Sequence, residues 1–128
     1  MKSVRLGIAC CLVLSLSLSP GGVFAHAAMV NSEPGRRAVL TIPPREIRLC
    51  FNENIEADFS TVDLADNAGK KIPLTAPVRD SGKPYCLTVP LPELQDGAYT
   101  VKYRVLSVDG HVVDYGYGFR LETRSGDK

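Results

Sequence analysis

Short runs of alternating apolar and polar residues, separated by turn residues, constrain the fold of this chain most. The clearest run is Tyr99 to Val105, in which two tyrosines and two valines alternate with Thr100, Lys102 and Arg104. A period of two places successive side chains on opposite faces of a β-strand, and the apolar face then needs a second sheet to cover it. No later segment has the period of an amphipathic helix. The sequence therefore predicts an all-β fold.

Eight short strands are predicted, and turn residues such as Asp66-Asn67-Ala68-Gly69 and Asp109-Gly110 separate them. Several short strands at regular spacing are typical of a β-sandwich. The predicted strands are residues 27–31, 38–41, 46–51, 60–64, 70–73, 85–90, 97–107 and 112–122.

The first residues have the pattern of a secretory signal peptide. Lys2 and Arg5 give a basic start, residues 6–18 are mostly apolar, and Pro20-Gly21-Gly22 ends the run. This run has about 13 residues, whereas a transmembrane helix needs about 20. The pattern therefore predicts a leader that is removed on export.

Two cleavage sites fit this leader. Val23 and Ala25 supply the small residues that signal peptidase prefers, and cleavage there would leave one domain of residues 26–128 that begins with His26. Cleavage after Ala27 also fits an A-x-A pattern and would delete the histidine. From the residues alone both sites stay open.

Charge and apolar content limit the partners of the exported chain. The 15 Lys and Arg residues, two of them in the leader, nearly balance 14 Asp and Glu residues, which gives no electrostatic case for nucleic acid. No second apolar stretch approaches spanning length. We therefore expect a mature chain without a transmembrane segment.

Only two of the four cysteines remain after export, because Cys10 and Cys11 lie in the leader. Cys50 and Cys86 each fall on the polar parity of a predicted strand, as an outward cross-strand pair would. Structural disulfides are common in oxidising compartments, so a Cys50–Cys86 disulfide is predicted. Two free thiols are the alternative, since strand adjacency is not visible in a sequence.

The chain has only two histidines, His26 and His111. A histidine at residue one offers both its α-amino nitrogen and its imidazole, a chelate that suits Cu(II). Asp109 can converge with His111 if Gly110 allows a tight turn, although Asp-Gly alone is an ordinary turn signal. Glu53 ends a strand, where it is either a solvated charge or a carboxylate that orients a ligand or lies axially.

Four motifs, in order, resemble the CopC family of periplasmic copper-resistance and copper-binding proteins. The first is His26-Ala27-Ala28-Met29-Val30-Asn31-Ser32-Glu33-Pro34, which is similar to the family's H-A-x-L-x-x-S-x-P start. The others are Ile47-Arg48-Leu49-Cys50-Phe51-Asn52-Glu53, Leu94-Gln95-Asp96-Gly97-Ala98-Tyr99-Thr100-Val101 and Ser107-Val108-Asp109-Gly110-His111. The resemblance covers residues 26–122.

The resemblance implies a Greek-key β-sandwich, immunoglobulin-like or cupredoxin-like, with seven to eight strands. It also implies one Cu(II) per chain, held by the amine and imidazole of His26 and by Asp109 and His111, with Glu53 nearby. Cleavage after Ala25 follows, because the family pattern begins with the histidine. Met29 is the only methionine after the leader, which favours a Cu(II)-only member.

The function implied by the resemblance is a periplasmic copper carrier or buffer, without enzymatic activity, that delivers copper to an inner-membrane importer of the CopD type. Two alternatives stay open. One is a histidine-brace copper oxidase or monooxygenase, which Asp109 disfavours because it would fill a coordination position. The other is a metal-free β-sandwich adhesion module.

Overall fold

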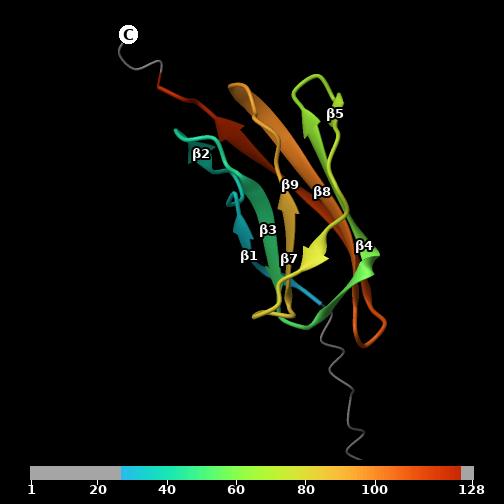
Figure 1. Ribbon diagram of the computed structural model, residues 1–128. Helices are drawn as coiled ribbons and strands as arrows, with labels where there is room; N and C mark the ends of the chain where they lie inside the picture. The colour runs from blue at the N-terminus through green and yellow to red at the C-terminus, as the bar shows by residue number, and fades with distance from the viewer. Residues whose placement is uncertain (1–26, 125–128) are drawn as a thin grey trace, which may run out of the picture.

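Two β-sheets pack face to face in the computed structural model, which describes residues 27–124 (Figure 1). The smaller sheet has the strand order β1-β3-β7-β6 and the larger sheet has the order β2-β9-β8-β4-β5. No helix among the described residues is long and apolar enough to cross a membrane. The strands are β1 (Met29–Glu33), β2 (Val39–Leu40), β3 (Glu46–Phe51), β4 (Ile55–Asp66), β5 (Lys71–Ile72), β6 (Val78–Arg79), β7 (Cys86–Pro90), β8 (Gly97–Ser107) and β9 (Val112–Leu121).

Strands that are distant in the sequence are neighbours in both sheets. β3 lies between β1 and β7, and β8 lies between β4 and β9, each pair antiparallel. The chain therefore crosses repeatedly between the sheets, as in a Greek key. The predicted all-β sandwich is confirmed.

The alternation in β8 places its apolar residues in the core. Tyr99, Val101, Tyr103 and Val105 are buried, whereas the three polar residues between them are exposed. Tyr103 meets the Phe51 ring edge-on, with centroids 5.7 Å apart. Aromatic and branched side chains from both sheets thus fill the space between them.

Two strand predictions were wrong. β4 begins at Ile55 rather than at residue 60. The sequence pattern did not indicate its first residues, because the pairing with β8 shifts register between Glu56 and Thr61 and this irregularity breaks the alternation. The Ser60 hydroxyl donates to the Glu56 carbonyl at 2.7 Å and accepts the Leu106 N–H at 3.2 Å. β6 was missed because two residues are too few to show a period.

Tyr117 on β9 makes the stability of the fold sensitive to alkaline pH. Burial raises the pKa of this phenol to about 12, above an ordinary value of about 10. A raised folded-state pKa means that the protonated form stabilises the fold below pH 10. This contribution is lost as the pH rises from about 10 to about 12.

We expect the free energy of unfolding, measured with urea, to decline less between pH 9 and pH 11 in Tyr117→Phe than in the unsubstituted protein. Some decline should remain, because burial also raises the pKa of Tyr99 and Tyr103. Identical pH profiles for the two proteins would contradict this assignment.

Candidate metal centre

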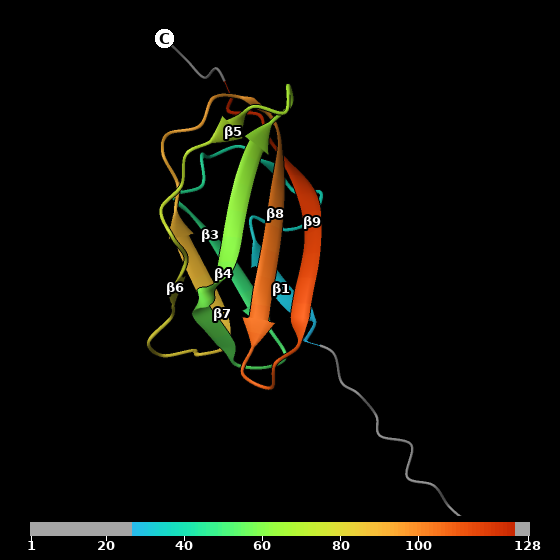
Figure 2. The ribbon, with the colours of Figure 1, turned by 90° about the vertical axis from the view of Figure 1, so that its right-hand side faces the viewer.

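Three segments meet at one end of the sandwich: the start of β1, the β3–β4 connection and the β8–β9 turn (Figure 2). The Asn52 N–H donates to the Ala28 carbonyl at 3.0 Å, and the Val108 N–H donates to the Asn54 carbonyl at 3.0 Å. The connection of residues 52–54 is therefore bonded to both of the other segments. We call residues 52–54 the bridging loop.

Gly110 shapes the β8–β9 turn as the sequence predicts. Its φ is +91°, a conformation that residues with a side chain rarely adopt. The Gly110 N–H donates to the Ser107 carbonyl at 3.0 Å, and the Ser107 N–H donates to the His111 carbonyl at 2.9 Å. This tight closure brings Asp109 Oδ1 to 3.0 Å from His111 Nδ1.

The Asp109 carboxylate is held in its ionised form. The Ser107 hydroxyl donates to Oδ1, and the His111 N–H donates to the same oxygen at 3.2 Å. The Ser107 bond is the largest cause, and the His111 side chain the next, that hold the pKa of Asp109 well below its ordinary range. The side chains of Asp109 and His111 are 42% and 34% exposed, so both can be reached from solvent.

Glu53 lies in the bridging loop but does not complete a ligand set. Its Oε2 atom is buried and has no hydrogen-bond partner among the described residues. Within residues 27–124, no three His, Cys, Asp or Glu side chains form a group that could hold a metal ion. The structure therefore brings Asp109 and His111 together without joining Glu53 to them, and His26 lies outside the described residues.

Two residues of this region had no role in the sequence predictions. Ser107 is 1% exposed, and its hydroxyl both donates to Asp109 and accepts the His111 N–H at 3.3 Å. Asn52 accepts the Ala28 N–H through Oδ1 at 2.8 Å. A buried serine two residues before Asp109 is a weak signal for such a role, because most serines near turns bond locally.

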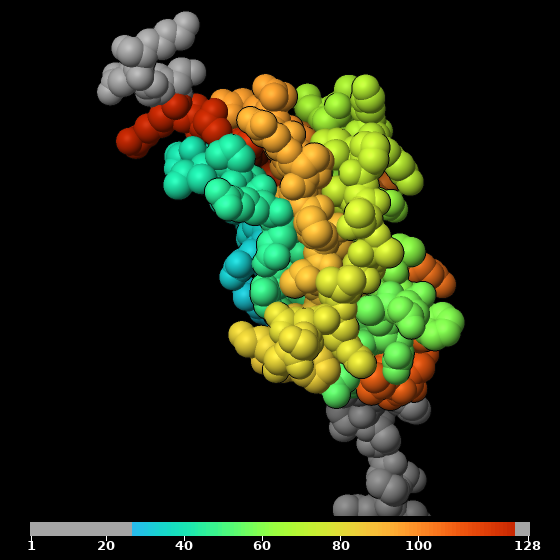
Figure 3. Space-filling model, viewed as in Figure 1, coloured from blue at the N-terminus to red at the C-terminus, as the bar shows by residue number. Residues whose placement is uncertain are grey.

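Cys50 and Cys86 form a disulfide across β3 and β7. Both residues lie on the face turned away from the central core, the parity expected from the sequence, but they are buried rather than exposed. The segment around residues 78–86, in yellow, lies at the surface at the lower left of the molecule (Figure 3). Cys50 lies two residues before the bridging loop in the sequence.

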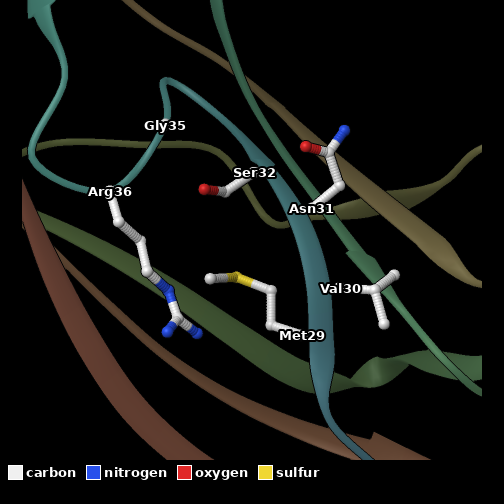
Figure 4. Close-up of a pocket in the computed structure, with 6 residues that line it drawn as sticks. All are labelled: Met29, Val30, Asn31, Ser32, Gly35 and Arg36. Carbon is white, nitrogen blue, oxygen red and sulfur yellow. The ribbon is translucent and has the colours of Figure 1, made fainter.

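A hollow beside β1 is lined by six of the described residues (Figure 4). Among those six, Arg36 is the one charged residue, and its guanidinium also lies 5.6 Å from the centre of the Tyr115 ring. A cation without carboxylate or imidazole neighbours in the lining offers no ligand set for a metal ion. The volume is about 310 Å³, and the lining residues are Met29, Val30, Asn31, Ser32, Gly35 and Arg36.

Comparison with known proteins identifies the family. The model of the CopC domain matches residues 29–122. Protein YobA of Escherichia coli K12 is 33% identical over 122 residues, which cover 94% of this chain and 96% of YobA. The copper transport protein CutJ of Bacillus subtilis is 29% identical over 116 residues, which cover 90% of this chain and 21% of CutJ.

The fold matches as well. The crystal structure of CopC from Methylosinus trichosporium OB3b superposes with a TM-score of 0.74 at 31% identity, over 80% of this chain and all of that one. Sequence and structure agree over the region that contains the β-sandwich and the Asp109–His111 turn, and the chain belongs to the CopC domain family.

Proposed function

We propose that this protein binds one Cu(II) ion per chain and acts as a non-enzymatic copper carrier or buffer in the periplasm. The observation that carries the proposal is the Asp109–His111 pair, whose facing side-chain atoms lie 3.0 Å apart at the end of the sandwich where β1 begins. His26 would complete the site after cleavage behind Ala25, with residues 26–128 as the mature domain. Its position in the sequence, three residues before β1, favours this role.

The chemistry of the donors fits Cu(II). Imidazole and amine nitrogens with a carboxylate oxygen make the tetragonal nitrogen and oxygen set that Cu(II) prefers. Because Nδ1 of His111 faces Asp109 Oδ1, Nε2 is the ring nitrogen that would bind the ion. Oδ1 already accepts bonds from Ser107 and the His111 N–H, so Oδ2 of Asp109 would be the oxygen ligand.

Glu53 would take part as a second carboxylate. Its buried Oε2 has no hydrogen-bond partner among residues 27–124, and a buried carboxylate oxygen without a partner is costly. A bond to the imidazole of His26, or an axial approach to the ion, would satisfy it. Carboxylates in this position fix the orientation of ligand imidazoles.

The partner would be a membrane importer of the CopD type. Residues that match this chain make up 21% of CutJ, a relative named as a copper transport protein. A domain that occurs as part of a longer transport protein is well suited to deliver the ion as a separate chain. Delivery of copper then requires that the site open toward solvent, which the exposure of Asp109 and His111 allows.

Titration of the processed protein with Cu(II) in an isothermal calorimeter tests this proposal. We expect one equivalent to bind, with an affinity that falls as the pH drops from about 8 to about 6, because the amine and the imidazoles must lose protons to bind the ion. Asp109 adds nothing to that fall, since its lowered pKa keeps it ionised.

Two outcomes would overturn the proposed function. Failure to bind Cu(II) near neutral pH would favour a metal-free β-sandwich module. Sustained oxygen consumption by the copper-loaded protein in the presence of ascorbate would favour a histidine-brace oxidase. A protein that consumes no oxygen in that assay and releases its copper to a competing chelator would behave as a carrier.

A further inference from the structure

The residue immediately before β1 is fixed by a reciprocal pair of hydrogen bonds. The Ala28 N–H donates to Asn52 Oδ1 at 2.8 Å, and the Asn52 N–H donates to the Ala28 carbonyl at 3.0 Å. Ala28 thus has both of its backbone polar groups bonded to one residue. Ala27, the preceding residue, is 3% exposed, so its side chain is also held in place.

The other side of the bridging loop is bonded to the β8–β9 turn. The Val108 N–H donates to the Asn54 carbonyl at 3.0 Å, and Ile55 pairs with Ser107. Val108 is the residue immediately before Asp109, and Ser107 holds its carboxylate. Three consecutive residues therefore connect the start of β1 with the turn that carries Asp109 and His111.

The bridging loop is itself anchored from outside. The Phe51 N–H donates to the Tyr85 carbonyl at 2.9 Å, and the Ile55 N–H donates to the Pro84 carbonyl at 3.1 Å. The Cys50–Cys86 disulfide lies beside these bonds. With both flanks anchored, a change in the loop's own contacts should alter local position rather than the fold.

We propose that Asn52 is a positioning residue, which clamps Ala28 and so sets where His26, two residues earlier, meets Asp109 and His111. This inference rests on the proposed copper site but concerns a residue that would not bind the ion. The clamp works through one side-chain oxygen, because the second bond uses the backbone N–H that any residue except proline supplies. The side-chain amide of Asn52 is therefore the specific element.

Substitution of Asn52 by alanine tests the clamp in two ways. In the metal-free protein we expect amide hydrogen exchange at Ala28 to accelerate by a factor on the order of five to ten, the loss of one net hydrogen bond. In the processed protein we expect Cu(II) affinity to fall by about 10-fold or more, as when a residue that orients a ligand is removed. The electron paramagnetic resonance spectrum of bound Cu(II) should broaden, because His26 would sample several positions.

The conservative variant and a matched control make the result specific. Asn52→Asp keeps an oxygen that can accept the Ala28 N–H, and we expect it to restore slow exchange and the unsubstituted spectrum. Asn31→Ala removes an exposed asparagine side chain of β1, and we expect neither readout to change. Thermal melts should show all three variants folded.

Unchanged exchange at Ala28 in Asn52→Ala would overturn the clamp. Faster exchange with unchanged copper affinity and spectrum would overturn the positioning role. Equal losses of affinity in Asn31→Ala and Asn52→Ala would overturn its specificity. If the unsubstituted protein binds no copper, the proposed function and the positioning role fail together, whereas the exchange measurement still decides whether the clamp exists.

Discussion

A processed chain with one alanine inserted before His26 is expected to bind Cu(II) more than 100-fold more weakly than the chain that begins with His26. The insertion converts the primary amine of His26 into a neutral amide nitrogen, whose lone pair is delocalised into the carbonyl group and is a poor ligand for the ion. Loss of a residue that only orients a ligand costs about 10- to 100-fold. Removal of the amine breaks the chelate itself, so the loss should exceed that range. Competition titration with a chelator of known affinity measures it.

The matched control for this insertion adds one alanine after Lys128, at the other end of the chain. It changes length and mass equally, but it leaves the proposed amine intact, and we expect no change in affinity. If the N-terminal insertion also left affinity unchanged, the amine would not be a ligand. The copper would then have to be bound without the α-amino group of His26.

The sandwich was predictable wherever alternation was regular. In β8, four inward residues alternate with three outward ones, and the burial of Tyr99 to Val105 follows from that period alone. In β4 the register shift after Glu56 interrupts the period, so the strand was recognised only from Ser60 onward. Pairing with β8 maintains the strand across the shift, and such tertiary pairing is not visible in one segment of sequence.

The candidate site was predictable to the extent that its contacts are local. Asp109 and His111 are two residues apart, so a single glycine turn is enough to make them meet. The Asn52–Ala28 clamp joins residues 24 positions apart, and it exists only because β1 pairs with β3. Glu53 was predicted near the site, but whether its side chain reaches the ion depends on His26.

The disulfide was predictable only in part. Opposite positions of Cys50 and Cys86 on β3 and β7 could not be deduced from the sequence, because the two strands are neighbours only in the folded sheet. Their shared polar parity was visible, and the structure has the same parity. Burial of the pair was not predicted, because polar parity in a strand indicates an outward side chain, whereas Cys50 and Cys86 are buried.

Replacement of Cys50 and Cys86 together by alanine is expected to lower the free energy of unfolding by about 4 kcal/mol. The disulfide joins residues 36 positions apart, and closing a loop of that length in the unfolded chain accounts for this value in the chain-entropy model. For a domain of this size the loss corresponds to a fall in Tm of about 15 to 30 °C. Calorimetry of the metal-free protein measures it.

Loss of the disulfide should change copper affinity far less than it changes the stability of the fold. The Phe51 and Ile55 N–H groups keep their bonds to the Tyr85 and Pro84 carbonyls when the disulfide is absent, so the bridging loop stays in place while the domain is folded. At 10 °C we expect less than a threefold change in Cu(II) affinity, well below the loss expected for Asn52→Ala. Reduction of the unsubstituted protein with a phosphine is the control, since it opens the bond without removing either sulfur atom. If copper affinity collapsed in a double variant that is still folded, the disulfide itself would shape the site, and the backbone bonds around residues 51–55 would not be sufficient to hold it.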